Sequence, residues 1–188
     1  RPETELLVEE AIAISQRCCS NSSFTIADVG AGCGIIAVAL ALCLPLAHIT
    51  ATDISGSALS LTRKNARHHG VIRRIQCVQA DLLTGLGRFD LICANLPYIR
   101  TKELETLTVA KHEPRLALDG GHDGLRVIDR LLTNACYHLR PRGRLLLEIG
   151  AGHRSAALKL SHTRLPRAQC YVLSDIAGRA RVLRVNSA

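Results

Sequence analysis

The sequence predicts a doubly wound α/β protein, in which helices cover both faces of a mostly parallel sheet. Short apolar runs of strand length alternate along the chain with longer segments of helical periodicity that end near glycine or proline. Such alternation is typical of crossover units, in which a helix connects two parallel strands. With 188 residues, 47% of them hydrophobic, the chain is long enough to form one domain over residues 1–188 with a substantial buried core.

The expected elements are bounded by turn-forming residues. Helices are expected at residues 4–18, with Thr4 as the N-cap, and at residues 35–44, 55–69, 125–139 and 155–162. Strands of the parallel part are expected at residues 24–29, 48–53, 72–80, 89–94 and 145–149, and an antiparallel pair at residues 169–173 and 181–185. A loop-rich stretch is expected over residues 99–122 and a turn at residues 141–143.

Composition restricts the classes of function. The net charge of +8 and the pI near 9.4 suit an acidic partner or RNA, but the basic residues are scattered along the chain. The eight cysteines form no C-x-x-C pair, and most of them stand singly in apolar runs. We interpret them as small buried residues in a reducing compartment, not as disulfides or metal ligands. No apolar stretch has the length and flanks of a membrane-spanning helix or a signal peptide.

Three strand ends carry residues suited to an adenosine-containing ligand. Asp28-Val29-Gly30-Ala31-Gly32-Cys33-Gly34 follows a strand and opens a helix, where glycines allow close approach of a ligand to the backbone. This loop alone also fits a dinucleotide-binding fingerprint. Asp53, at the end of the second strand, can bind two ribose hydroxyls or cap the next helix. Asp81, after the third strand, can meet an adenine edge or belong to a turn.

The fourth strand ends in Asn95-Leu96-Pro97-Tyr98. The amide oxygen of Asn95 and nearby backbone carbonyls can accept hydrogen bonds from a planar –NH2 group, and Tyr98 can pack on the flat face of that group. Proline cannot continue the hydrogen-bond ladder, so the chain leaves the sheet here. An isolated tetrapeptide of this kind can equally be an ordinary turn, and the upstream motifs favour the binding interpretation.

With these motifs the sequence resembles the class I S-adenosylmethionine-dependent methyltransferases. The glycine loop is similar to their first motif, Asp53 to their ribose-binding acid, and residues 95–98 to the Asn-Pro-Pro-Tyr motif of enzymes that methylate planar amino groups. More narrowly, the chain resembles the HemK/PrmC family of release-factor glutamine N5-methyltransferases. The further matches are Arg1-Pro2-Glu3-Thr4-Glu5, Glu113-Pro114-x-x-Ala117-Leu118, Gly121-x-Asp123-Gly124-Leu125, Leu147-Glu148-x-Gly150 and Asp175-x-x-Gly178-x-x-Arg181.

The resemblance implies a Rossmann-like, mostly parallel seven-stranded sheet with an antiparallel C-terminal strand. It also implies methyl transfer from S-adenosylmethionine to the N5 amide of a protein glutamine, with a release factor as partner and S-adenosylhomocysteine as product. A cytoplasmic monomer with no membrane and no metal is expected. Asn95, Leu96, Pro97 and Tyr98 are expected to act in catalysis and, with Glu113 and Pro114, in substrate binding. The cofactor is expected at Asp28, Gly30, Ala31, Gly32, Cys33, Gly34, Asp53, Ile54, Asp81, Leu82 and Asn95.

The sequence departs from the family pattern in two places. Leu96 stands where the motif has its first proline, and we expect its side chain only to permit the turn. This sequence does not include the small helical domain that precedes the Arg-Pro-Glu-Thr-Glu element in the family and is implicated in holding the protein substrate; it was either cut away or never present. Recognition of the protein substrate is therefore the least specified part of the expected function.

The motifs are also compatible with acceptors and roles of a different class. The same turn chemistry serves adenine N6 or guanine N2 in nucleic acid, and direct nucleic-acid binding is compatible with the charge without being required. A ribosomal-protein glutamine methyltransferase would carry similar motifs. A cofactor-binding module that acts through a partner without catalysis would share the glycine loop and the strand-end acids.

Overall fold

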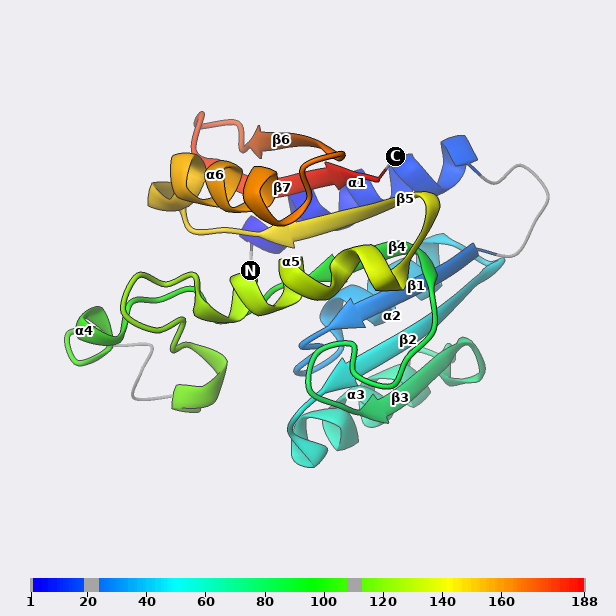
Figure 1. Ribbon diagram of the computed structural model, residues 1–188. Coiled ribbons are helices and arrows are strands. Elements are labelled where there is room, and N and C mark those ends of the chain that lie inside the picture. The colour runs from blue at the N-terminus through cyan, green and yellow to red at the C-terminus, as the bar shows by residue number, and fades with distance from the viewer. Residues whose placement is uncertain (1, 19–23, 108–112, 188) are drawn as a thin grey trace.

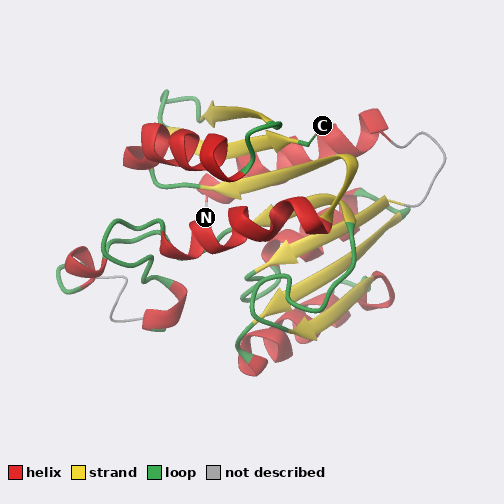
Figure 2. Ribbon diagram, in the orientation of Figure 1, coloured by secondary structure: helices red, strands yellow, loops and turns green. Residues whose placement is uncertain are grey.

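In the computed structural model, which describes residues 2–18, 24–107 and 113–187, the strands form one sheet with helices on both faces (Figures 1 and 2). The sheet has seven strands in the order β3-β2-β1-β4-β5-β7-β6. Neighbouring strands from β3 to β5 are parallel, whereas β7 runs antiparallel to both β5 and β6. The strands are β1 (Phe24–Val29), β2 (Ala47–Asp53), β3 (Ile75–Gln79), β4 (Phe89–Ala94), β5 (Leu139–Glu148), β6 (Gln169–Ser174) and β7 (Ala180–Asn186).

The helices divide between the two faces, because the central strands are apolar on both sides. Leu91 and Cys93 of β4 join the core under α1 (Pro2–Cys18), α2 (Ile35–Cys43) and α3 (Gly56–His68). The alternate residues Ile92 and Ala94 join the core under α5 (Arg126–His138) and α6 (Arg154–Arg164). A short helix, α4 (Thr101–Leu104), lies in the connection that follows β4 (Figure 1). No helix within the described ranges is long and apolar enough to span a membrane.

The predicted fold class is confirmed, and β1 and β4 have the predicted bounds. Strands β2, β6 and β7 differ from expectation by a single residue at one or both ends, whereas β3 and β5 differ by more. Residues Ile72–Arg74 form a turn of 3-10 helix, so β3 begins only at Ile75. The turn expected at residues 141–143 lies inside β5, where Arg142 has a φ of 62° and the register against β4 shifts. An irregularity of this kind lets extra residues leave the ladder without ending the strand.

The structure corrects two predictions, the role of Thr4 as an N-cap and the burial of the cysteines. Helix α1 begins at Pro2, a residue well suited to a first helical turn, so Thr4 lies inside the helix with a buried side chain and is not its N-cap. Of the six cysteines whose side chains the structure describes, Cys33, Cys43 and Cys136 are exposed and only Cys93 is buried, which corrects the expectation of burial. The exposed cysteines lie on surface helices or loops, where an apolar neighbourhood in sequence does not imply burial.

The strand order reverses at β1, which lies between β2 and β4. In open α/β sheets, ligands bind outside the carboxyl ends of the strands at such a reversal. Val29 at the end of β1 pairs with Ala94 at the end of β4. The glycine loop and the turn that begins at Asn95 therefore leave the sheet side by side.

Candidate active site

The glycine loop after β1 is held tightly between two neighbours. A Cβ atom on Gly30 (φ 71°) would lie 2.9 Å from Leu96 Cδ2, and one on Gly34 (φ 80°) would lie 2.6 Å from Thr62 Cγ2. Thr62 of α3 also donates a hydrogen bond of 2.9 Å to the carbonyl of Gly32. The loop thus has a defined shape because glycine permits both its left-handed backbone and its close contacts.

Asp53 connects the end of β2 to this loop. Its Oδ2 accepts the N–H of Gly32 at 2.9 Å, and its Oδ1 accepts the N–H of Ser55 at 2.9 Å. Ser55, not Asp53, is the N-cap of α3, because its hydroxyl accepts the N–H of Ala58 at 3.2 Å. Each carboxylate oxygen has a further lone pair, so these bonds leave Asp53 able to accept hydrogen bonds from a ligand.

Asp28 is fully buried beneath the loop. Its Oδ2 accepts the N–H of Ala37 in the first turn of α2 at 2.9 Å, whereas its Oδ1 has no hydrogen-bond partner among the described residues. The pKa of Asp28 is raised to about 7, mainly because the carboxyl group is buried; the Ala37 hydrogen bond lowers it, and the negative charge of Asp53 adds to the rise. A buried acceptor without a partner is suited to a positively charged ligand group nearby.

Three further predicted cofactor residues follow the ends of β2 and β3. Asp81 is exposed and forms an ion pair with Arg130 of α5 at 2.6 Å. Leu82 adopts a positive φ of 54°, and its carbonyl accepts the Thr52 hydroxyl at 3.0 Å. The Ile54 side chain is 52% exposed beside Asp53. An adenine contact for Asp81 stays a prediction.

The two non-glycine residues within the glycine loop differ in burial. Ala31 is buried, and its N–H donates to the carbonyl of Thr52 at 2.8 Å. Cys33 is exposed, and its carbonyl accepts the side-chain amide of Asn65 at 2.8 Å. The loop is therefore held from β2 and α3 as well as by its own glycines.

The turn after β4 presents an oriented amide. Asn95 Nδ2 donates to Glu148 Oε2 at 2.8 Å and to Thr4 Oγ1 at 3.2 Å. Within the described residues Asn95 Oδ1 has no hydrogen-bond partner. Tyr98 donates its hydroxyl to Glu148 Oε1 at 3.2 Å. The nitrogen of Asn95 therefore points into the protein, and its oxygen is left to accept a hydrogen bond from a ligand.

Leu96 has a packing role that the sequence did not indicate. Its side chain is only 3% exposed and lies in the core beside the glycine loop, so it does more than permit the turn. Pro97 follows it and is partly exposed. The two halves of the site, the loop after β1 and the turn after β4, are in contact through this leucine.

Sequence reasoning missed the buried partners of Asn95, namely Thr4 and Glu148. Both lie in segments that match the family pattern, Arg1-Pro2-Glu3-Thr4-Glu5 and Leu147-Glu148-x-Gly150. A glutamate at the end of an otherwise apolar strand was the one available signal, since a buried acid needs hydrogen-bond donors. Nothing in the sequence specified which donors these would be.

The matched segment from Glu113 to Leu125 packs behind Tyr98. Ile99 donates its N–H to the carbonyl of Leu118 at 3.0 Å, and Gly120 donates to the carbonyl of Ile99 at 2.8 Å. The structure places Pro114 at the exposed start of this segment, ahead of the 3-10 turn Arg115–Ala117. Substrate binding by Glu113 and Pro114 stays a prediction.

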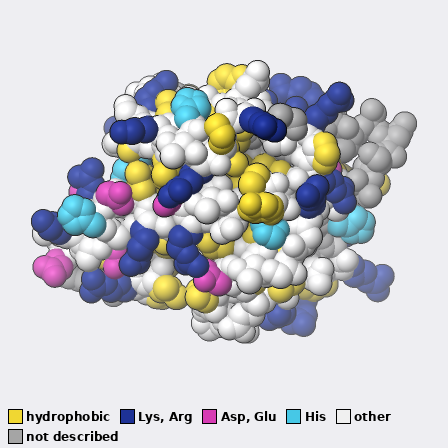
Figure 3. Space-filling view, in the orientation of Figure 1, with side chains coloured by type: hydrophobic (Ala, Val, Ile, Leu, Met, Phe, Trp, Pro, Cys, Tyr) yellow, Lys and Arg dark blue, Asp and Glu magenta, His cyan; other side chains and the backbone are white. Residues whose placement is uncertain are grey.

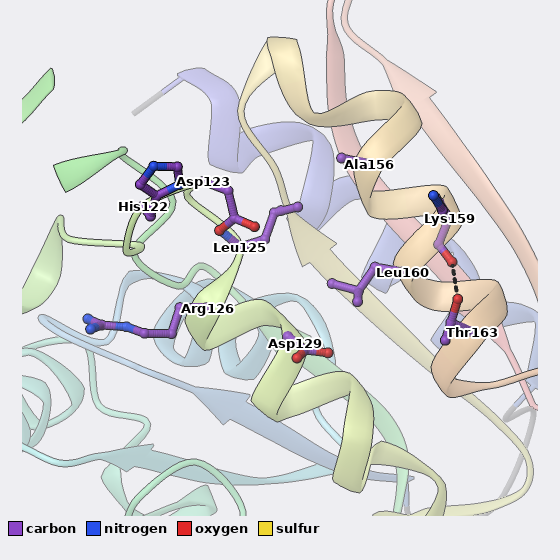
Figure 4. A pocket seen from close by; sticks show the side chains of 9 residues that line it. All are labelled: His122, Asp123, Leu125, Arg126, Asp129, Ala156, Lys159, Leu160 and Thr163. Carbon is purple, nitrogen blue, oxygen red and sulfur yellow. Dashed lines mark hydrogen bonds between the residues drawn. The ribbon is translucent and has the colours of Figure 1, made fainter. Parts of the chain in front are cut away.

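A hollow of about 540 Å³ opens between the loop before α5 and helix α6 (Figure 4). Leu125 and Leu160 face each other across it, and Asp123, Arg126 and Lys159 lie along its margin. Asp123 supports the loop by accepting the N–H of Leu125 at 2.9 Å. The hollow adjoins the segment behind Tyr98 but contains none of the residues predicted for the site.

Known proteins resemble this chain in sequence and in fold. A family model described as methyltransferase small domain matches residues 4–113. A release factor glutamine methyltransferase of Moorella thermoacetica is 44% identical over 184 residues, which cover 96% of this chain and 64% of that protein. Its counterpart from Rhodopirellula baltica is 38% identical over 194 residues, covering 100% of this chain and 66% of that protein. This chain thus spans just under two thirds of the length of these curated relatives.

Among solved structures, a ribosomal protein L11 methylase from Lactobacillus delbrueckii subsp. bulgaricus superposes with a TM-score of 0.66 at 22% identity. The match covers all of this chain and 81% of that one. The fold is that of the class I methyltransferases, as the strand order and the antiparallel β7 also indicate. Since the family model covers more than half of the sequence, this chain belongs to the methyltransferase small domain family.

The buried Asp28 predicts a specific dependence of stability on pH. Its pKa is raised from 3.8 to about 7, so its contribution to stability is complete below pH 3.8 and is lost as the pH rises through about 7. Asn at this position cannot ionise. Between about pH 5 and pH 8, the free energy of unfolding of Asp28→Asn should therefore rise relative to the parent protein by about 2–3 kcal/mol. Urea denaturation across this range measures the difference, and parallel curves for the two proteins would contradict it.

The close packing behind Tyr98 predicts that Gly124 does not tolerate a side chain. Gly124 has a φ of 79°, and its Cβ would collide with the Tyr98 carbonyl oxygen and lie 2.8 Å from His153 Nε2. Gly124→Ala should lower the free energy of unfolding by about 1–3 kcal/mol. Gly152→Ala is the control, because a Cβ at Gly152 meets no atom within 4 Å. Equal stability of the two variants in urea denaturation would contradict the prediction, because it would mean that the segment shifts to accept the added Cβ at little cost in free energy.

Proposed function

We propose that this chain is the catalytic part of an enzyme that transfers a methyl group from S-adenosylmethionine to a glutamine side-chain nitrogen (N5) in a protein. The proposed glutamine is that of the Gly-Gly-Gln segment of peptide chain release factors. The observation that carries the proposal is the oriented amide of Asn95, with its nitrogen bound to Glu148 and the turn that bears it packed on the glycine loop. The names of the curated relatives support the choice of a release factor, and hence a cytoplasmic role in translation termination.

The residues around the glycine loop fit the cofactor. When bound, S-adenosylmethionine supplies a reactive methyl group on a positively charged sulfur. Asp53 provides negative charge on that side of the site, and the buried Asp28, whose pKa is raised to about 7, has an Oδ1 without a hydrogen-bond partner among the described residues. When the cofactor is bound, Asp53 would accept its ribose hydroxyls, and the exposed Ile54 beside Asp53 would offer an apolar surface to its ring. The glycine loop lets backbone N–H groups approach the ligand closely.

The turn after β4 fits the acceptor. The nitrogen of a carboxamide is a poor nucleophile because its lone pair is delocalised into the carbonyl. Asn95 Oδ1 and the backbone carbonyl of Leu96 each accept one N–H of the acceptor amide and so fix the plane of the group. Tyr98 packs against that plane, while Glu148 accepts its hydroxyl. Positioning and preorganised polar contacts of this kind are sufficient to favour in-line transfer.

Nucleic acid is the main competing acceptor, because the net charge is +8 and an adenine or guanine amino group has the same planar chemistry. On the face shown in Figure 3, basic side chains are spread over the surface and do not gather in one patch. Counterion release from nucleic acid requires several phosphate contacts along one track. This face therefore gives a nucleic-acid acceptor no specific support, and RNA belongs in the methylation assay as a competing substrate.

The test is incubation of the chain with methyl-labelled S-adenosylmethionine and a purified release factor, followed by peptide mass mapping. We expect one methyl group on the glutamine of Gly-Gly-Gln and none on a release factor with asparagine there. Asn95→Ala should lower kcat at saturating release factor by about 10²-fold, because one preorganised polar contact is lost. Ribosomal RNA and ribosomal proteins are offered in parallel, and label in either of these but not in the release factor would overturn the proposal.

A second prediction concerns Asp53 and the ribose. Asp53→Ala should raise the dissociation constant of S-adenosylhomocysteine about tenfold or more, because bonds to a charged acceptor contribute about 1.5–3 kcal/mol. Thr62→Val is the matched control, since it removes the hydrogen bond from Thr62 to the loop carbonyl of Gly32 without removing the acid. Calorimetry with an analogue that lacks the ribose hydroxyls completes the comparison. An equal loss of affinity for both ligands in Asp53→Ala would refute the ribose contact.

A further inference from the structure

We propose that Glu148 is a positioning residue that determines which way round the Asn95 amide is held, and that Thr4 completes this arrangement. The inference rests on the proposed function, because it concerns the orientation of the group that receives the acceptor amide. Glu148 ends β5, is fully buried, and accepts hydrogen bonds from Thr4, Asn95 and Tyr98. Its role is exerted through Asn95 and not by contact with the acceptor.

The amide of asparagine has two ends of nearly equal size, so shape alone cannot orient it. At Asn95 the neighbouring oxygen atoms determine the orientation of the amide. Glu148 Oε2 lies 2.8 Å from Asn95 Nδ2, where an amide oxygen in place of the nitrogen would face another acceptor. Asn95 itself is only partly buried, but Thr4 and Glu148 are buried, so the Nδ2 end of the amide lies against protein oxygens. Glu148 therefore selects the orientation in which Oδ1 points away from the core.

Thr4 uses the second N–H of the same amide. Its Oγ1 accepts from Asn95 Nδ2 at 3.2 Å and donates its own hydrogen to Glu148 Oε2 at 2.8 Å. Both N–H groups of Asn95 are thus engaged, and every donor in the set has an acceptor. Tyr98 adds its hydroxyl at 3.2 Å to the other oxygen of Glu148, so the same group also fixes the end of the Tyr98 ring.

A purely structural account would have Glu148 do no more than join α1 to β5. The two accounts differ in what a substitution changes. A structural role affects stability and all steps of turnover together. A positioning role lowers kcat, leaves the affinity for the cofactor nearly unchanged, and depends on the direction of the hydrogen bond between residues 95 and 148.

The first experiment compares Glu148→Gln with Glu10→Gln in the full chain. Glutamine keeps the shape of Glu148 but offers a donor and an acceptor, so it no longer selects one orientation of Asn95. We expect kcat to fall about tenfold or more, with the dissociation constant of S-adenosylhomocysteine within about threefold of the parent value. Glu10 is a partly buried glutamate paired with Arg184, and Glu10→Gln removes the same charge without touching Asn95. Equal kcat values in the two variants would overturn the proposal.

The second experiment reverses the hydrogen bond. Asn95→Asp alone places two acceptors against each other and should lose nearly all activity. In the double variant Asn95→Asp with Glu148→Gln, the new amide can donate to the new carboxylate, whose other oxygen still accepts from the substrate. We expect the double variant to exceed Asn95→Asp by about tenfold or more in kcat, a coupling that a double-mutant cycle measures. Additive losses would contradict a role in orientation.

A third measurement needs no methyl acceptor. The side-chain NH2 protons of Asn95, assigned by their loss in Asn95→Ala, should exchange with solvent about tenfold or more faster in Glu148→Gln than in the parent protein. Unchanged exchange would overturn the proposed orientation even if turnover falls. If the exchange result holds while no release factor is methylated, the proposed acceptor is wrong and the positioning role stands. The two proposals can therefore fail separately.

Discussion

Glu148 accepts hydrogen bonds from two segments that are far apart in the sequence: the first helix, through Thr4, and the turn after β4, through Asn95 and Tyr98. Burying a carboxyl group is costly unless donors surround it. Here the donors are the residues that the proposed chemistry needs in fixed positions. The same contacts thus satisfy the buried acid, anchor α1 at the end of the sheet, and orient the Asn95 amide.

The glycine loop is the second constraint on the site. Leu96 connects it to the turn whose Asn95 and Tyr98 bind Glu148. The loop is fixed by Asp53 and Thr62 on one side and by the Leu96 side chain on the other. Because Gly30 is in contact with the residue that follows Asn95, a shift of the loop would displace the acceptor turn. The residues proposed for the cofactor and those proposed for the acceptor therefore form one packed unit at the reversal of strand order.

The parts that could be predicted from the sequence are those determined locally. Strands β1 and β4 had the predicted bounds because both faces are buried and their ends carry glycine or proline. The glycine loop and the Asn95 turn could be predicted as well, because glycine and proline mark the strand ends at which they begin. Thr4 and Glu148 could not be paired in advance, since 144 residues separate them and no periodicity links them. Burial of the individual cysteines also depended on tertiary contacts, and three of them proved to be exposed.

The amino end of α1 lies beside the acceptor turn, because Thr4 is two residues into a helix that starts at Pro2 and is bonded to Asn95. A peptide or domain joined ahead of this helix would therefore leave the protein next to the proposed reaction site. Tethering there would raise the effective concentration of any attached substrate-binding module at that site without a new contact in the catalytic fold. The hydrogen bond from Asn95 to Thr4 thus makes the amino end of α1 part of the architecture of the site.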